Sequence, residues 1–181
     1  KIPVKKHDHV LIPAGTVHCS GADTMVLEIS ATPYIFTFKL WDWGRVDLDG
    51  KPRPIHLEHG AANIQWYRNT EWVHRNLVNA VAEVYTGENG TVVRTGLHER
   101  EFLDTFRFTT SSTLPVHRNG SVHMLNLVDG TRAVLRSKSD AFPPLELHYA
   151  ETCIVPQAAG DYEISSPDGS EVKVILACVR N

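Results

Sequence analysis

The sequence predicts a mainly β protein of the jelly-roll or β-sandwich class, with one short helical segment. Short apolar segments with alternating side chains recur along the chain, separated by turns rich in glycine, proline and asparagine. A single stretch, which begins near Asn69, has instead the apolar spacing of a helix. Strands at such regular intervals are typical of two antiparallel sheets that pack face to face.

The composition is that of an ordinary globular protein. The 181 residues are 42% hydrophobic and 22% charged, which provides enough apolar material for a buried core. The formal net charge is −3 and the isoelectric point is near 6.4, and lysine and arginine form no run. This balance gives no electrostatic basis for binding nucleic acid or an anionic membrane. No apolar segment approaches the roughly 20 residues that span a bilayer, and no signal peptide opens the chain.

The three cysteines indicate a reducing environment. Cys19, Cys153 and Cys178 are odd in number, far apart in the sequence and set among apolar residues. Their spacing does not match a zinc knuckle, so we expect reduced, buried thiols. Because disulfides are rare in the cytosol, we expect a cytoplasmic protein.

The first prominent element is a strand that runs into a tight turn. Val10–Ile12 is apolar and ends at Pro13, and Gly15 supplies the backbone angles that the turn needs. His18 then opens the next strand. An imidazole in this place is a ready ligand for zinc or a similar ion.

Two more strands are expected before residue 42. The residues of Met25–Ile29 alternate between two faces, and Glu28 shares its face with Val26. If that face is the inner one, Glu28 either supports a ligand residue or pairs with Lys39 or Arg45. The alternative is a wall residue in a salt bridge. Tyr34–Trp41 is rich in aromatic and β-branched residues. Lys39 is the lone cation on its face, which indicates either function or a snorkelling edge lysine. Arg45 follows as a second cationic candidate for contact with an anion.

The segment after these strands is a turn-rich loop. Within Val46–Ile55, Arg53 either contacts a phosphate or is simply exposed. Histidine clusters lie at His7–His9 and at His56–His59. Each has the residue types of a metal site, but such short motifs are weak evidence, and we interpret the first as a solvated turn and the second as surface.

The helical stretch begins at an N-cap. Asn69 or Thr70 precedes an early acidic residue, Glu71, and the apolar stripe continues to about Val81. This stripe predicts packing rather than a partner groove. The glycines of Thr86–Gly90 then mark a turn or a boundary.

The remainder predicts a second antiparallel unit. Glu101–Thr109 carries its phenylalanines on one side, and Asn119-Gly120 predicts a hairpin between Leu114–Arg118 and Val122–Val128. Asp129-Gly130 predicts another turn. Further strands are expected at Arg132–Arg136, His148–Val155 and Val172–Val179. A second turn, near Gly160, has no histidine after it, so this unit lacks a metal motif.

The motifs of the first half carry a family resemblance. Pro13-x-Gly15-x-x-His18 resembles the second metal motif of cupin barrels. With Asp42-Trp43-Gly44-Arg45 and Asp49-Gly50-Lys51-Pro52-Arg53 behind it, the chain resembles the C-terminal portion of class I mannose-6-phosphate isomerases (phosphomannose isomerases), in their long divergent bacterial form. The resemblance implies closing strands of the catalytic cupin barrel in residues 1–60, a helical connector in 61–90 and a jelly-roll-like domain without a metal motif in 91–181.

The resemblance also implies a site. In the family one zinc ion is held by a glutamine, a histidine and a glutamate from earlier strands and by the histidine of the turn. His18 matches that last ligand, and the other three are expected outside this chain. Where the family carries a catalytic arginine, Thr37-Phe38-Lys39 places a lysine, which lacks the planar fork of arginine. Lys39 and Arg45 are expected to stabilise negative charge during the reaction.

The implied function is that of a zinc-dependent aldose–ketose isomerase acting on a sugar phosphate, which interconverts mannose 6-phosphate and fructose 6-phosphate. This chain alone is expected to be inactive and to self-associate through apolar surface that a missing N-terminal part would cover. Two alternatives stay open: a catalytically inert cupin module that senses sugar or mediates assembly, and a different cupin isomerase or epimerase.

Overall fold

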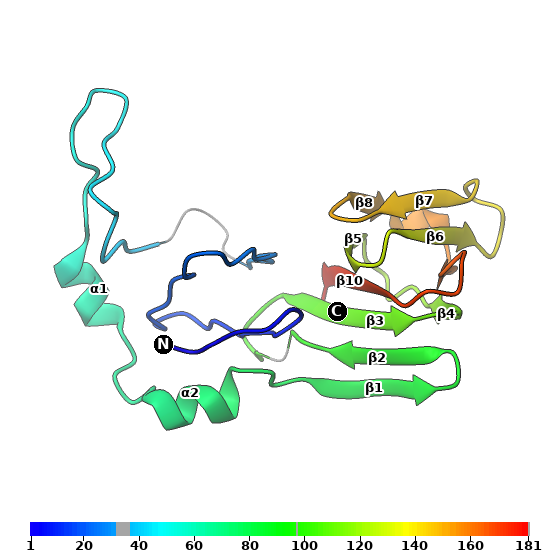
Figure 1. The fold of residues 1–181 in the computed structure, drawn as a ribbon, viewed down its shortest axis with the longest axis horizontal. Helices are drawn as coiled ribbons and strands as arrows, with labels where there is room; N and C mark the ends of the chain where they lie inside the picture. The colour runs from blue at the N-terminus through cyan, green and yellow to red at the C-terminus, as the bar shows by residue number, and fades with distance from the viewer. Residues whose placement is uncertain (32–36, 97, 181) are drawn as a thin grey trace. The chain divides into compact units, whose positions relative to one another are not determined.

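The computed structural model describes residues 1–31, 37–96 and 98–180 (Figure 1). The chain forms two compact units. One unit joins Lys1–Leu11 to the chain from Asn79 onward, and the other is Ile12–Val78. Among the described residues, no helix combines the length and the apolar character that crossing a membrane requires.

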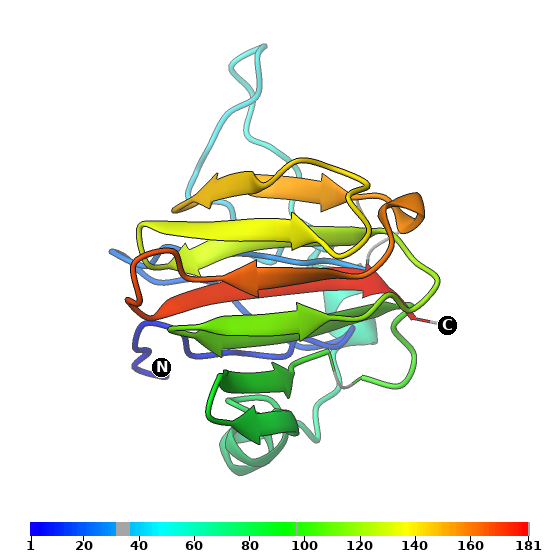
Figure 2. The ribbon, with the colours of Figure 1, turned by 90° about the vertical axis from the view of Figure 1, so that its right-hand side faces the viewer.

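The first unit contains two antiparallel sheets. One sheet has six strands, in the order β1 (Ala82–Gly87), β2 (Gly90–Arg94), β3 (Leu103–Thr110), β10 (Val172–Val179), β5 (His123–Asp129) and β8 (Thr152–Val155). The other has four strands, in the order β4 (Thr113–Val116), β9 (Tyr162–Ser165), β6 (Arg132–Ser137) and β7 (Leu145–His148). A short 3-10 helix, Gln157–Ala159, precedes β9. Figure 2 shows β1, β2, β3 and β10 side by side, from dark green to red. This arrangement confirms the predicted mainly β, jelly-roll class.

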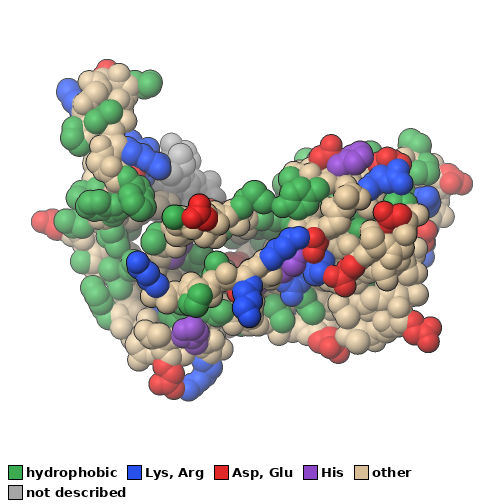
Figure 3. Space-filling view, viewed as in Figure 1, with side chains coloured by type: hydrophobic (Ala, Val, Ile, Leu, Met, Phe, Trp, Pro, Cys, Tyr) green, Lys and Arg blue, Asp and Glu red, His purple; other side chains and the backbone are tan. Residues whose placement is uncertain are grey.

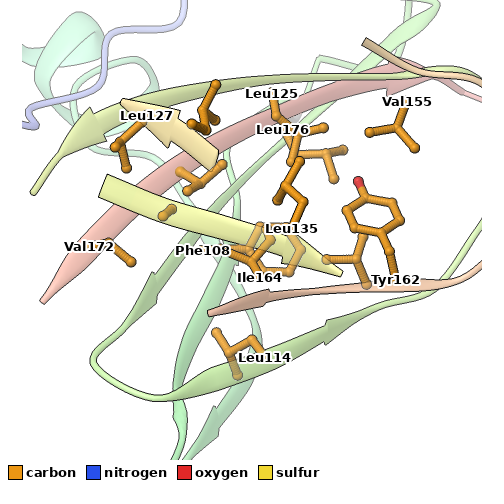
Figure 4. Packing of buried hydrophobic residues seen from close by; sticks show 14 of the residues in the cluster. Phe108, Leu114, Leu125, Leu127, Leu135, Val155, Tyr162, Ile164, Val172 and Leu176 are labelled. Atoms are coloured by element: carbon orange, nitrogen blue, oxygen red, sulfur yellow. The ribbon is translucent and has the colours of Figure 1, made fainter. Parts of the chain in front are cut away.

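Alternation along the strands builds the core between the two sheets. In β5, His123, Leu125 and Leu127 point inward, whereas Met124 lies on the outer face. Figure 4 shows leucines of β5 and β10 packed with side chains of β6 and β9, among them Tyr162. Truncating one such leucine to alanine typically costs about 2–5 kcal/mol, because a cavity is left behind.

Three polar side chains, two of them buried in this core, are linked by hydrogen bonds. His123 is 2% exposed, and its Nδ1 lies 2.9 Å from the hydroxyl oxygen of Tyr162. Its Nε2 lies 3.1 Å from Oδ1 of Asn119, which anchors the turn before β5. Burial lowers the pKa of His123 to about 4. The imidazole is therefore neutral at pH 7, and its two nitrogens are both satisfied.

The predicted hairpin at Asn119-Gly120 is wrong. β4 pairs with β9 and β5 pairs with β10 and β8, so this turn carries the chain from one sheet to the other. A glycine turn signals a reversal of direction but does not decide which strands exchange hydrogen bonds. The predicted strand His148–Val155 is likewise two strands, β7 and β8, because the chain turns at Ala150, whose φ is 66°. The strand Val172–Val179 is confirmed as β10.

Some elements were missed. β1 and β2 form a hairpin across the predicted turn near Gly90, and β1 is exposed along its whole length, so it lacks the alternation that predicts a strand. β9 is too short to stand out. Phe102 is 51% exposed and lies before β3 rather than in the core. Of the three free cysteines only Cys178 is buried, and Cys19 is exposed, so the expectation of burial is wrong for Cys19.

The second unit contains α1 (Leu57–Asn63) and α2 (Thr70–Asn76). Asn69 is the N-cap of α2, and its side chain accepts a hydrogen bond from the backbone N–H of Trp72 at 3.0 Å. The helix ends at Asn76 rather than near Val81. The helical part is thus split in two, since the chain leaves the helical conformation at Ile64.

The strands predicted in residues 10–41 do not form as regular elements. Neither Val10–Ile12 nor Met25–Ile29 belongs to a strand, and the described part of Tyr34–Trp41, from Thr37 onward, is not a strand either. Residues 32–36 of that prediction lie outside the described residues. Alternation shows which side chains would share a face, but a strand also needs a neighbour that completes its hydrogen bonds.

Candidate functional site

The turn that carries His18 is tightly constrained. The backbone N–H of Thr16 donates to the carbonyl oxygen of Pro13 at 3.2 Å and closes the turn. Gly15 has a φ of 79°, and a Cβ there would lie 2.6 Å from the carbonyl oxygen of Asn63. Glycine is therefore required both by its backbone angles and by the close approach of the chain after α1.

Arg68, far along the sequence of the same unit, forms hydrogen bonds with this turn. Its Nη1 donates to the carbonyl oxygens of Pro13 (3.1 Å) and Ala14 (2.8 Å) and to Oγ1 of Thr16 (2.5 Å). The backbone N–H of Gln65 adds a bond of 3.0 Å to the carbonyl oxygen of Gly15. The segment that leads into α2 therefore fixes the path of the chain into His18.

Sequence reasoning missed Arg68. Its guanidinium carbon lies 5.6 Å from the ring centroid of Tyr67 and 5.3 Å from that of Trp72, within the range of a cation–π interaction. The sequence did show an arginine flanked by aromatic residues, which is the pattern of a cation–π interaction. Nothing in the sequence places it next to a turn more than fifty residues earlier.

His18 itself is exposed, and its ring is oriented by its own turn. Its Nδ1 lies 2.9 Å from the carbonyl oxygen of Thr16. Because a carbonyl only accepts, Nδ1 carries the proton and Nε2 keeps a free lone pair, the arrangement usual for a metal-binding histidine. Within the described residues, however, no three His, Cys, Asp or Glu side chains gather to hold a metal ion. His18 suits a single ligand position, and the described residues alone do not fit a zinc ion.

Asp42 joins Lys39 to Arg53. Nε and Nη2 of Arg53 each donate to a carboxylate oxygen of Asp42 at 2.6 Å, and Nζ of Lys39 lies 3.5 Å from Oδ1. The guanidinium of Arg53 holds the pKa of Asp42 below its ordinary value, and the pKa of Arg53 is raised in turn. This two-pronged ion pair fixes one end of the loop against the other and places Arg53 in a structural role.

Arg45 lies in this loop with its side chain exposed. Its backbone N–H donates to the carbonyl oxygen of Asp42 at 2.9 Å, and its carbonyl accepts from the N–H of Arg53 at 3.2 Å. In the described part of the chain its guanidinium takes part in no ion pair, so its charge is open to an anion. The carboxylate that contacts Lys39 is Asp42, whereas Glu28 is exposed.

The histidines of the second cluster pack against the segment of Lys39. The N–H of His56 donates to the carbonyl oxygen of Lys39 at 2.7 Å, and its Nδ1 accepts from the N–H of Lys39 at 3.2 Å. The ring of Phe38 lies 6.1 Å from that of His56 and 5.9 Å from that of His59. His56 is half-buried rather than a surface residue, and it fixes the backbone at Lys39. Among the described residues, no hydrogen bond or ion pair links His18 to Lys39 or Arg45.

The two antiparallel sheets with Greek-key-like crossings form a jelly roll. No family model matches the chain. The chain is similar to mannose-6-phosphate isomerases: it is 38% identical over 58 residues to that of Streptococcus mutans and 36% identical over 65 residues to that of Bacillus subtilis. These matches cover 32% and 36% of this chain but only 18% and 20% of those proteins.

Solved structures extend the similarity along the chain. The mannose 6-phosphate isomerase of Bacillus subtilis superposes with a TM-score of 0.55 at 13% identity, over 77% of this chain and 39% of that one. A variant of phosphomannose isomerase from Salmonella typhimurium superposes with a TM-score of 0.52 at 15% identity, over 72% of this chain and 30% of that one. At such identities the superpositions show the fold. The resemblance expected from the motifs is thus confirmed, and the chain spans well under half the length of each relative.

Proposed function

We propose that this chain is the C-terminal part of an isomerase that interconverts mannose 6-phosphate and fructose 6-phosphate. The observation that carries the proposal is the local sequence identity of 38% and 36% to two proteins named mannose-6-phosphate isomerase. In this assignment residues 1–60 correspond to the closing part of the catalytic barrel, 61–90 to a connector and 91–181 to an accessory jelly roll.

The chemistry assigned to this chain is the binding of negative charge. Isomerisation of an aldose to a ketose passes through an enediolate, and the substrate also carries a phosphate. Arg45 presents an exposed guanidinium with no ion-pair partner in the described part, and Lys39 lies 36% exposed beside Asp42. A preorganised cation that meets charge as it develops lowers the barrier of such a step. The general base is not assigned to a residue of this chain.

His18 is proposed as one zinc ligand of the complete site. Its Nδ1 hydrogen bond to Thr16 supports this role, because that bond leaves Nε2 free to bind. Three more ligands are needed from outside the described residues. When bound, zinc would act as a Lewis acid toward the sugar oxygens. The contribution of this chain is to hold His18 in place through Arg68 and Gly15.

The test is turnover of mannose 6-phosphate, followed by a coupled assay for fructose 6-phosphate. The full-length gene product that carries this chain is assayed with zinc, and the 181-residue chain is assayed beside it. We expect turnover by the former and none by the latter. Absence of turnover in the zinc-loaded, folded full-length product contradicts the proposal and favours an inert cupin module.

A further inference from the structure

The first unit contains a hollow that the proposed function does not use. It has a volume of about 330 Å³ and lies between the N-terminal segment and the outer face of the six-stranded sheet. Its lining combines basic, acidic, polar and apolar side chains, and consists of Lys6, His7, Asp8, Asn79, Val81, Thr91, Val93, Arg107, Thr109 and Lys173. Hollows of this size hold small molecules.

The floor lies on three neighbouring strands and is polar except for Val93, which stands opposite Arg107. Thr91 of β2 pairs with Thr109 of β3, and Thr109 pairs with Lys173 of β10. Arg107 lies two residues before Thr109 and therefore on the same face. Directly opposite residues in a sheet lie about 5 Å apart, so two hydroxyls and two cations lie within roughly 10 Å of one another on the same face.

The N-terminal segment forms the opposite wall and is held by specific bonds. The carbonyl oxygen of His7 accepts from Nη1 of Arg107 at 2.7 Å, and Nε2 of His7 lies 2.8 Å from Oδ2 of Asp129. Asn79 and His9 exchange hydrogen bonds of 2.7 and 2.8 Å. The turn at His7–His9, which we interpreted as solvated, is instead fastened to the sheet.

Around the hollow the two lysines have ion-pair partners and Arg107 has none within 4.0 Å among the described residues, although hydrogen bonds from Lys5 and Asn79 and the charge of Arg107 together lower the pKa of Asp8. Asp129 is paired with Lys6 and with Lys173, which also pairs with Glu171. Asp8 accepts from the N–H of Lys5 and from the amide of Asn79. No carboxylate of a described residue comes within ion-pair distance of Arg107.

Three other arginines of the same unit make such pairs, whereas Arg100, Arg118 and Arg136 make none among the described residues. Arg94 and Arg180 share Asp104, and Arg132 pairs with Glu146. Arg107 is half-buried, which makes an unpaired charge there costly unless a ligand completes it.

We propose that this hollow binds a small organic phosphate, with Arg107 as the principal cation and the hydroxyls of Thr91 and Thr109 as donors. A tetrahedral phosphate offers acceptor oxygens in several directions and suits donors from the floor and from Lys6 above it, whereas a carboxylate offers two oxygens in one plane. The face shown in Figure 3 has basic and acidic side chains interspersed rather than one broad basic surface, which favours a small anion over a long polyanion.

Isothermal titration of the full 181-residue chain with inorganic phosphate tests the proposal. We expect saturable binding that Arg107→Gln weakens at least about ten-fold, which corresponds to 1.4 kcal/mol. Arg136→Gln is the matched control, because Arg136 is an exposed strand arginine of the other sheet. Thr109→Val keeps the strand and the N-terminal contact and is expected to weaken binding as well.

Three results would overturn the proposal. The first is no saturable binding of phosphate by the unaltered chain up to about 10 mM. The second is equal weakening by Arg107→Gln and Arg136→Gln, which would reveal nonspecific attraction. The third is acetate binding as tightly as phosphate, which would reassign the hollow to carboxylates. None of these outcomes depends on isomerase activity.

Discussion

Arg68 and Thr16 are 52 residues apart in the sequence, yet Nη1 of Arg68 lies 2.5 Å from Oγ1 of Thr16. Arg68 also donates to the carbonyl oxygens of Pro13 and Ala14, so its guanidinium holds the turn that carries His18 in place. The position of the candidate metal ligand therefore depends on a residue next to α2.

Arg68→Gln is expected to loosen the turn. A hydrogen bond from a charged group typically contributes about 1.5–3 kcal/mol, and Arg68 donates to three oxygens of the turn. Without these bonds the turn should open more often, and the backbone amide of Thr16 should exchange with solvent at least about ten-fold faster. Hydrogen exchange read by NMR measures this. Arg75→Gln is the control, since Arg75 is exposed and its ion pair is with Glu71, within α2 itself. If the Thr16 amide exchanged at the same rate in both variants, Arg68 would not be what holds the turn in place.

Gly15→Ala should destabilise the protein more than Gly44→Ala. Both glycines have a positive φ, of 79° and 66°, so each alanine incurs a backbone cost of about 1–2 kcal/mol. Only at Gly15 does the new methyl group meet backbone, the carbonyl oxygen of Asn63 at 2.6 Å, whereas nothing lies within 4 Å at Gly44. Urea unfolding of the two variants compares the costs, and equal losses of stability would contradict the close packing of the turn.

Because His123 is buried and neutral, we expect the free energy of unfolding to fall in mild acid. Its pKa is about 4 in the folded chain and near its ordinary value of 6.5 when unfolded, so the unfolded chain binds the proton first. The stabilisation by the neutral imidazole is complete above pH 6.5 and is lost progressively toward pH 4. Between pH 7 and pH 5 the free energy of unfolding should fall by about 2 kcal/mol from this residue.

The measurement is urea unfolding at both pH values for the unaltered chain and for His123→Phe. The variant loses the bond to Tyr162 and starts less stable, but its pH dependence should be flatter by that amount. His117→Gln is the control, because His117 is exposed. An unchanged slope in His123→Phe would contradict the assignment.

If the full-length protein is the isomerase proposed above, Lys39→Ala is expected to lower its kcat by about 10²-fold or more, the usual effect of removing one group that stabilises developing charge. Lys51→Ala, in the same loop and exposed, should leave kcat nearly unchanged. Steady-state kinetics with mannose 6-phosphate distinguishes the two. Equal kcat values would leave Lys39 only its structural contact with Asp42.

In the first unit, the sequence predicts where strands lie better than it predicts which strands pair. β10 is predicted to the residue because alternation and burial coincide along Val172–Val179. The turn at Asn119-Gly120 is also present, but pairing across sheets is decided by contacts between distant segments. β1 carries no alternation to detect because it is exposed throughout.

For the candidate site, local motifs were informative and long-range contacts were not. Pro13, Gly15 and His18 stand in one short motif with known turn chemistry, and the structure forms that turn. The clamp by Arg68 and the fork between Arg53 and Asp42 join segments that no local pattern connects. The roles of His18, Lys39 and Arg45 stay predictions.

Zinc content and turnover measured together in His18→Ala decide whether this turn belongs to a metal site. In the full-length gene product, we expect this variant to lose bound zinc and conversion of mannose 6-phosphate together, whereas His117→Ala should keep both. Retention of zinc and of turnover by His18→Ala would contradict the assignment of this turn to an isomerase metal site.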